Sequence, residues 1–159
     1  MISLLLAALL AQVDAPVKDD ARRYGVSVVS CYDGDTCTID FQFSTNIGLG
    51  MMTGVVLTGQ KVRFCDIDAP EMKGAGLTPE ERSRAKLVRD RLLQWLKDAK
   101  RVWMEIPQKK GCDPMLYTNC DKRDKYGRWL VWVYADDSLL NERLVDEGLA
   151  TVSRFQCDD

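Results

Sequence analysis

The chain has 159 residues, of which 46% are hydrophobic, and this is enough for one globular domain with a single core. Its 22 lysines and arginines are outnumbered by 24 aspartates and glutamates, and a formal net charge of −2 argues against a protein that covers many phosphates with a basic surface. Histidine is absent from the sequence, so any catalysis must use carboxylates, arginine, lysine, tyrosine, cysteine or a hard metal ion.

The N-terminal segment contains an apolar run, Leu4–Ala11, that is too short to span a bilayer and is typical of a signal peptide. Val13 and Ala15 suit the positions before a cleavage site, although no basic residue precedes Lys18. The alternative is a short amphipathic or buried N-terminal helix. We expect residues 1–15 to be a signal peptide of a secreted or periplasmic protein without stable membrane association.

The residues that follow predict strands at the start of one domain over residues 16–159. We expect a strand over residues 25–32, a tight turn at Asp33-Gly34 and a return strand over residues 36–43. Residues 44–59 are rich in glycine and threonine and predict an extended β-arm or a long hairpin. A third strand is expected over residues 61–68.

A long helix is predicted to start at Thr78-Pro79-Glu80-Glu81, since threonine and glutamate form a capping box and proline suits the first helical position. Apolar residues follow at steps of three and four and predict one buried face: Ala85, Val88, Leu92, Trp95, Leu96 and Ala99. The opposite face is basic, and we interpret most of it as a solvated surface: Arg82, Arg84, Lys86, Arg89 and Arg91.

The second half of the domain predicts strands over residues 102–106 and 128–134, with a polar loop over residues 108–123 between them. A short helix over residues 138–147 is expected to end at Gly148, and residues 149–154 are expected to be extended. This order predicts an α+β domain in which one long and one short helix pack on a five-stranded OB-fold β-barrel.

An even number of cysteines in a small chain with a possible leader favours disulfides, and the six are Cys31, Cys37, Cys65, Cys112, Cys120 and Cys157. No pair has the close spacing of a zinc site. Cys112 and Cys120 bracket a short polar segment, so we expect a bridge between them. The sequence leaves the pairing of the other four open.

Two short segments combine carboxylates with a turn: Asp33-Gly34-Asp35-Thr36 and Asp66-Ile67-Asp68-Ala69-Pro70-Glu71. Oxygen ligands without histidine suit a hard cation such as Ca²⁺, with Mg²⁺ as its competitor. By itself the first segment is more often an ordinary hairpin turn, because aspartate and glycine favour the backbone angles of turns.

Two arginines make these acidic segments more specific. Arg63 stands just before the second segment, and Arg128 ends the stretch Asp124-Lys125-Tyr126-Gly127-Arg128. Phosphodiester hydrolysis requires positive charge against the phosphate oxygens and a carboxylate that activates water. Arginine suits this task because its planar fork matches phosphate and keeps its charge.

Four motifs carry a resemblance that runs from about Gly25 to Phe155, and they are Val29–Thr36, Arg63–Glu71, Asp124–Arg128 and Asn141–Ala150. With these motifs in this order, the chain resembles the thermonuclease family, the micrococcal-nuclease-like enzymes. The resemblance implies an OB-fold nuclease, expected to be a monomer, that acts on DNA and RNA, needs Ca²⁺ and leaves 3′-phosphate ends.

The resemblance also implies a role for each matching residue. Metal ligands would be Asp35, Asp68 and the backbone carbonyl of Ala69, and the catalytic residues would be Arg63, Glu71 and Arg128. Asp33, Thr36 and Asp124 would support the ligands and arginines, whereas Lys125 and Tyr126 would lie near the nucleotide. Arg154 stands where the best-known member has a tyrosine, so we expect it to contact a phosphate.

A non-catalytic OB-type module that binds nucleic acid or a protein is the main alternative. Such modules typically lack part of the metal or arginine set, whereas this sequence has the whole set. A third possibility, an exported oligosaccharide-binding domain, would leave Arg63 and Arg128 without a role. The arm between Thr38 and Arg63 is longer than the short hairpin of the best-known family member and is expected to reshape the substrate groove.

Overall fold

The computed structural model describes residues 21–46, 52–112 and 120–157. The signal peptide expected over residues 1–15 lies outside these ranges. The elements in chain order are β1 (Ala21–Cys31), β2 (Thr36–Asn46), β3 (Met52–Phe64), β4 (Ile67–Asp68), α1 (Pro79–Asp98), β5 (Val102–Pro107), β6 (Trp129–Ala135), β7 (Ser138–Leu139), α2 (Leu140–Asp146) and β8 (Thr151–Val152).

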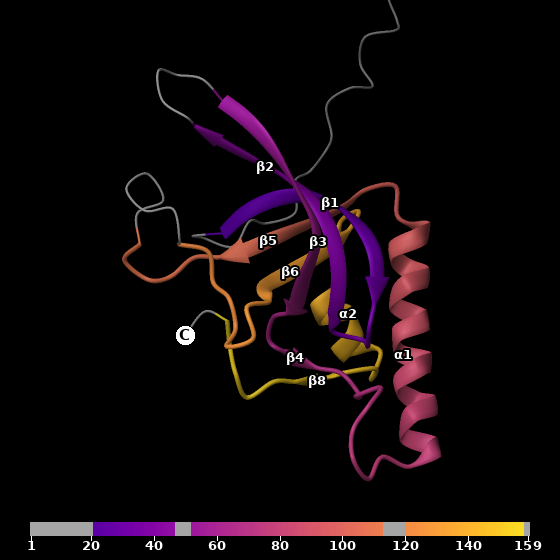
Figure 1. Ribbon diagram of the computed structural model, residues 1–159. Helices are drawn as coiled ribbons and strands as arrows, with labels where there is room; N and C mark the ends of the chain where they lie inside the picture. Colours follow the sequence, from indigo (N-terminus) through magenta and orange to yellow (C-terminus); the bar gives the residue numbers. More distant parts are fainter. Residues whose placement is uncertain (1–20, 47–51, 113–119, 158–159) are drawn as a thin grey trace, which may run out of the picture.

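Five strands close into a barrel in the order β3-β2-β1-β5-β6, and a parallel pairing between β3 and β6 completes the ring. Two helices pack on it: α1 runs along one side, and α2 lies near the lower end (Figure 1). β7 pairs with the C-terminal end of β6, and β4 pairs with β8 as a separate two-stranded sheet. The predicted five-stranded OB-fold barrel with one long and one short helix is therefore confirmed.

Helix α1 contributes its apolar face to the core, as its sequence pattern predicts. Thr78 and Glu81 form the capping box through reciprocal hydrogen bonds, and proline occupies the first turn. The buried side chains of the helix are Ala85, Val88, Leu92, Trp95 and Leu96. The basic face carries surface ion pairs, such as that between Lys86 and Asp90, which agrees with a solvated surface.

The hairpin of β2 and β3 continues beyond the barrel as an arm, as expected for residues 44–59. The two strands remain paired up to Asn46 and Met52, and the arm projects away from the helices (Figure 1). Gly59 has a φ of 63°, in the left-handed region, beside a register shift between Ile39 and Phe41. Here glycine allows the ribbon to change direction where it leaves the barrel.

Several predicted boundaries were wrong; β1, for example, starts at Ala21 and not at residue 25. The strand expected over residues 61–68 ends at Phe64, because the chain turns at Asp66, which has a φ of 67°. The helix expected over residues 138–147 starts at Leu140, since the two preceding residues pair with β6 as β7. The predicted stop at Gly148 agrees with its φ of 69°.

Three disulfides connect the described cysteines. The predicted Cys112–Cys120 bridge is present, and the others are Cys31–Cys37 and Cys65–Cys157. Such a set is typical of proteins that fold in an oxidising compartment. Among the described residues, no helix has the length and apolar character needed to span a membrane.

Candidate active site

The turn between β1 and β2 is held tightly against the rest of the domain. A Cβ atom on Gly34 would lie 2.5 Å from Cγ1 of Val88 and 2.8 Å from Cβ of Ala69. Glycine is thus required here by close approach to α1 and to the segment after β4, and not by unusual backbone angles. This packing buries Asp33 and Asp35 on either side of the glycine, with exposed fractions of 4% and 1%.

Replacement of Gly34 by alanine is expected to lower the free energy of unfolding by about 1–3 kcal/mol, because the methyl group overpacks this contact. Chemical denaturation measures the effect. Gly25→Ala is the matched control, since no atom lies within 4 Å of a Cβ built there. Equal stability of the two variants would contradict the close-packed turn.

Asp35 joins the turn to two other segments. Its Oδ2 accepts a hydrogen bond of 2.6 Å from the backbone N–H of Ala69, and its Oδ1 accepts one of 3.1 Å from the hydroxyl of Thr36. The backbone carbonyl of Asp35 accepts from the N–H of Phe64 at 2.8 Å. Asp33 supports this arrangement by accepting from the N–H of Asp35 at 3.3 Å.

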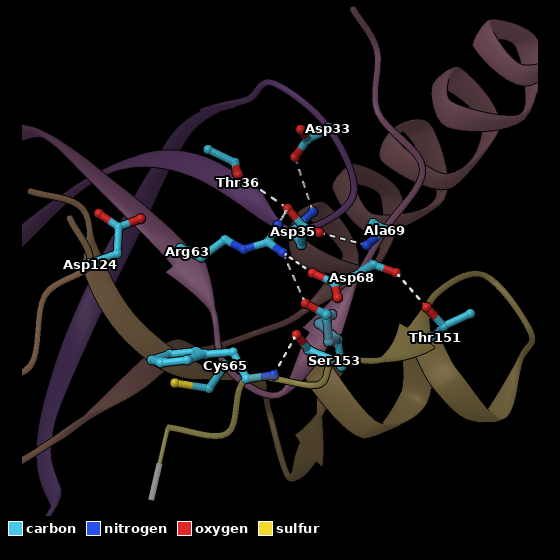
Figure 2. A network of polar contacts seen from close by, with 12 residues as sticks. Asp33, Asp35, Thr36, Arg63, Cys65, Asp68, Ala69, Asp124, Thr151 and Ser153 are labelled. Atoms are coloured by element: carbon cyan, nitrogen blue, oxygen red, sulfur yellow. Dashed lines mark hydrogen bonds and ion pairs between the residues drawn. The ribbon is translucent and has the colours of Figure 1, made fainter. Parts of the chain in front are cut away.

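Arg63, at the end of β3, connects the two acidic segments. Its guanidinium forms ion pairs with Asp35 and with Asp68, the latter at 2.5 Å, and donates to the carbonyl of Ile67 at 3.1 Å. Figure 2 shows Arg63 pointing between the two carboxylates, with Ala69 beside Asp35. The Asp68 side chain is 53% exposed whereas that of Asp35 is buried, so this acidic pair reaches from the interior to solvent.

The orientation of Arg128 is fixed by the turn over residues 124–128, through contacts with Asp124. Asp124 accepts from the Arg128 Nε at 2.6 Å and from the N–H groups of Tyr126 and Arg128 at 2.9 Å each. The Arg128 Nη1 also donates to the hydroxyl of Thr36 at 3.2 Å. Since that hydroxyl donates to Asp35, Thr36 links Arg128 to the buried carboxylate.

These residues face an open groove with a volume of about 580 Å³. Six of the residues predicted from sequence or resemblance line it, and they are Arg63, Asp68, Asp124, Lys125, Tyr126 and Arg128. The structure therefore brings both arginines and two carboxylates of the predicted set, those of Asp68 and Asp124, to a single surface. Four further residues do not line the groove but are linked to it through the contacts described above, and they are Asp33, Asp35, Thr36 and Ala69.

The structure does not bring two predicted site residues into this network. Glu71 and Arg154 are both exposed and do not line the groove. Phe155, which the sequence interpretation did not include, lines the groove with an exposed fraction of 63%. Its only sequence signal is an aromatic residue in an otherwise polar C-terminal segment.

Burial raises the pKa of Asp33 above its ordinary value of 3.8, and the nearby Arg63 guanidinium partly opposes this effect. The folded protein therefore binds a proton at Asp33 more tightly than the unfolded chain does. The resulting stability is fully present below pH 3.8 and is lost as the pH rises through the pKa of the folded state.

Asp33→Asn is expected to remove this pH-dependent contribution while keeping an oxygen that accepts from the N–H of Asp35. The unfolding free energy of the wild type, relative to the variant, should decrease as the pH rises above 3.8 and then become constant. Urea denaturation of both proteins from pH 3 to pH 8 measures the difference. A difference that increases with pH would contradict the raised pKa.

Comparison with known proteins gives one family match. The family model described as "Staphylococcal nuclease homologue" matches residues 61–159. The matched region contains Arg63, Asp68, Ala69, Glu71 and Arg128, whereas Asp35 precedes it. No curated protein matches the chain.

Proposed function

The chain belongs to the family of staphylococcal nuclease homologues, and we propose that it is a calcium-dependent endonuclease that hydrolyses DNA and RNA to products with 3′-phosphate ends. The observation that carries this proposal is the network in which Arg63 and Arg128, both at the groove, converge on the buried carboxylate of Asp35. A module that only binds nucleic acid would not require two arginines fixed around a buried carboxylate.

The chemistry of the donor groups fits a calcium ion. Asp35 and Asp68 offer carboxylate oxygens, Ala69 offers its carbonyl, and hard cations prefer such an all-oxygen set. Within the described ranges, Arg63 is the one cation that forms an ion pair with either carboxylate. The remaining negative charge would be offset by Ca²⁺, which when bound supplies positive charge against the phosphate oxygens.

The two arginines would bind the scissile phosphate. Asp124 and Thr36 fix the direction of the Arg128 guanidinium before substrate arrives, so little ordering is needed on binding. Arg63, which pairs with Asp68, would contribute a second guanidinium group to the same phosphate. The planar, positively charged guanidinium groups of both arginines can stabilise the negative charge that develops on the phosphate.

Glu71 would act as the general base. Glu71 is exposed, so water can reach its carboxylate. In the sequence it stands three residues after the proposed ligand Asp68. Removal of a proton from water allows a P–O bond to form while the bond to the 5′ oxygen breaks. The phosphate then remains on the 3′ oxygen, and the departing 5′ oxygen takes up a proton from solvent water and becomes a hydroxyl group.

The rest of the proposed account concerns substrate binding and location. Lys125, Tyr126 and Arg154 would contact the nucleic acid outside the reacting phosphate. The enzyme would act as a monomer outside the cytoplasm after removal of residues 1–15, leaving one domain over residues 16–159. The three disulfides support such a location, because they persist in oxidising compartments.

End-group analysis of the products tests the proposed reaction. DNA and RNA oligonucleotides labelled at the 5′ end are incubated with the protein and Ca²⁺, and the fragments are offered to a primer-extending polymerase. The fragments should be extended only after treatment with a 3′-phosphatase. Fragments that are extended directly would contradict the assigned bond, and intact oligonucleotides would support the binding module instead.

A further inference from the structure

The segment that follows β8 is tied to the floor of the groove at both of its ends. Both ends are hydrogen-bonded to Asp66, which lines the groove. The N–H of Ser153 donates to the Asp66 carbonyl at 2.8 Å, and the N–H of Cys157 donates to the Asp66 Oδ1 at 2.7 Å. The Cys65–Cys157 disulfide fixes the same end covalently. Figure 2 shows Ser153 and Cys65 directly below the network of Arg63 and Asp68. Residues 153–157 therefore form a fixed wall of the groove.

The same segment is also ordered internally. The N–H of Phe155 donates to Oγ of Ser153 at 3.2 Å, and Nε2 of Gln156 donates to the backbone carbonyl of Ser153 at 2.6 Å. Ser153, Phe155 and Cys157 line the groove, whereas Arg154 and Gln156 do not. Every second residue of this wall thus lines the groove.

Phe155 is the aromatic residue that this wall presents. A single exposed apolar side chain is ordinary on a protein surface, but Phe155 shares its groove with Tyr126, which is 72% exposed. Four cationic side chains line the same groove beside three carboxylates, and the cations are Arg63, Arg123, Lys125 and Arg128. Aromatic faces beside a cationic track are the combination that binds single-stranded nucleic acid, since bases stack while phosphates pair with the cations.

We infer that residues 153–157 are a disulfide-anchored wall that presents Phe155 as a stacking surface for an unpaired base of a single-stranded nucleic acid. The inference rests on the proposed function and deepens it, because it assigns a base-contacting residue and a role in substrate binding to the Cys65–Cys157 bridge. Phe155 contributes to affinity for the strand, and the disulfide positions it.

The test of Phe155 is a binding measurement made with a chelator present, so that no cleavage occurs. Fluorescence anisotropy gives the Kd of a labelled single-stranded DNA and of an abasic strand of the same length. Phe155→Ala should weaken binding of the base-containing strand about tenfold and leave the abasic strand unchanged. Leu87→Ala is the control, since Leu87 on α1 is 60% exposed but does not line the groove.

Two outcomes would overturn the role of Phe155: equal affinity of Phe155→Ala and Leu87→Ala for the base-containing strand, or an equal loss of affinity for both strands. Steady-state cleavage with Ca²⁺ separates this inference from the proposed function. Phe155→Ala should raise KM and leave kcat nearly constant. A wild type that binds strands in this pattern without cutting them would contradict the proposed function alone.

The role of the disulfide has its own variant pair. Cys65→Ser combined with Cys157→Ser should weaken binding of the base-containing strand as Phe155→Ala does, and adding Phe155→Ala to this pair should cause little further loss. Cys112→Ser combined with Cys120→Ser is the control, because neither cysteine lines the groove. Unchanged affinity of a folded Cys65/Cys157 variant, or fully additive losses, would contradict the positioning role.

Discussion

Replacement of Arg128 by alanine is expected to lower kcat for cleavage of single-stranded DNA by about 10³-fold. The guanidinium is already aimed at the groove by Asp124 and Thr36, so its loss removes a preorganised charge from the transition state. The fold should survive, because the side chain is partly exposed and is not part of the core. Single-turnover cleavage and a thermal denaturation curve measure the two effects separately.

Two controls sharpen the result for Arg128. Arg128→Lys keeps the positive charge but loses the planar fork, so it should recover only part of the activity. Arg82→Ala removes an exposed arginine from the basic face of α1 and should leave cleavage unchanged. If Arg128→Ala kept wild-type activity, the assignment of Arg128 to the phosphate would be wrong.

Replacement of Asp35 by asparagine is expected to reduce the affinity for Ca²⁺ by at least about 100-fold and to abolish cleavage at low calcium concentration. Asparagine retains an oxygen that can accept from the N–H of Ala69 but removes the buried negative charge. Isothermal titration calorimetry with Ca²⁺ measures the binding directly. It remains informative if the variant is inactive for another reason.

Asp137→Asn is the control for the loss of one carboxylate, since Asp137 is exposed and does not line the groove. Its calcium affinity should equal that of the wild type. Wild-type calcium affinity in Asp35→Asn would exclude Asp35 as a ligand. It would also leave the acidic pair of Asp35 and Asp68 with a purely structural role beside Arg63.

Local sequence signals predicted the elements that depend on neighbouring residues. The start of α1 follows from Thr78 and Glu81, and its buried face follows from the spacing of Val88, Leu92 and Trp95. The bridge between Cys112 and Cys120 also closes a short, local loop. In each case the interacting residues are close in the sequence, so the pattern alone contains the information.

Features that depend on distant contacts were not predictable in this way. The break of the third strand occurs at Asp66, whose carboxylate accepts from Trp132 and from the backbone of Cys157, far along the chain. The need for glycine at position 34 comes from Val88 on α1. Both features require the assembled fold before they become visible.

The candidate site shows the same division. The acidic segments predicted that Asp35 and Asp68 share a cation, and the structure places one guanidinium against both. The roles expected for Arg63 and Arg128 came from the family resemblance, because no local pattern brings together residues so far apart in sequence. Phe155 escaped notice because its place in the groove depends on the Cys65–Cys157 bridge and on Asp66.

Cleavage of single-stranded DNA with and without a chelator tests the central claim most directly. The purified protein should degrade the strand in the presence of Ca²⁺, lose this activity when the chelator is added, and recover it when calcium is restored in excess. Activity that is equal with and without the chelator would contradict calcium dependence. An intact strand under every condition would contradict the nuclease itself.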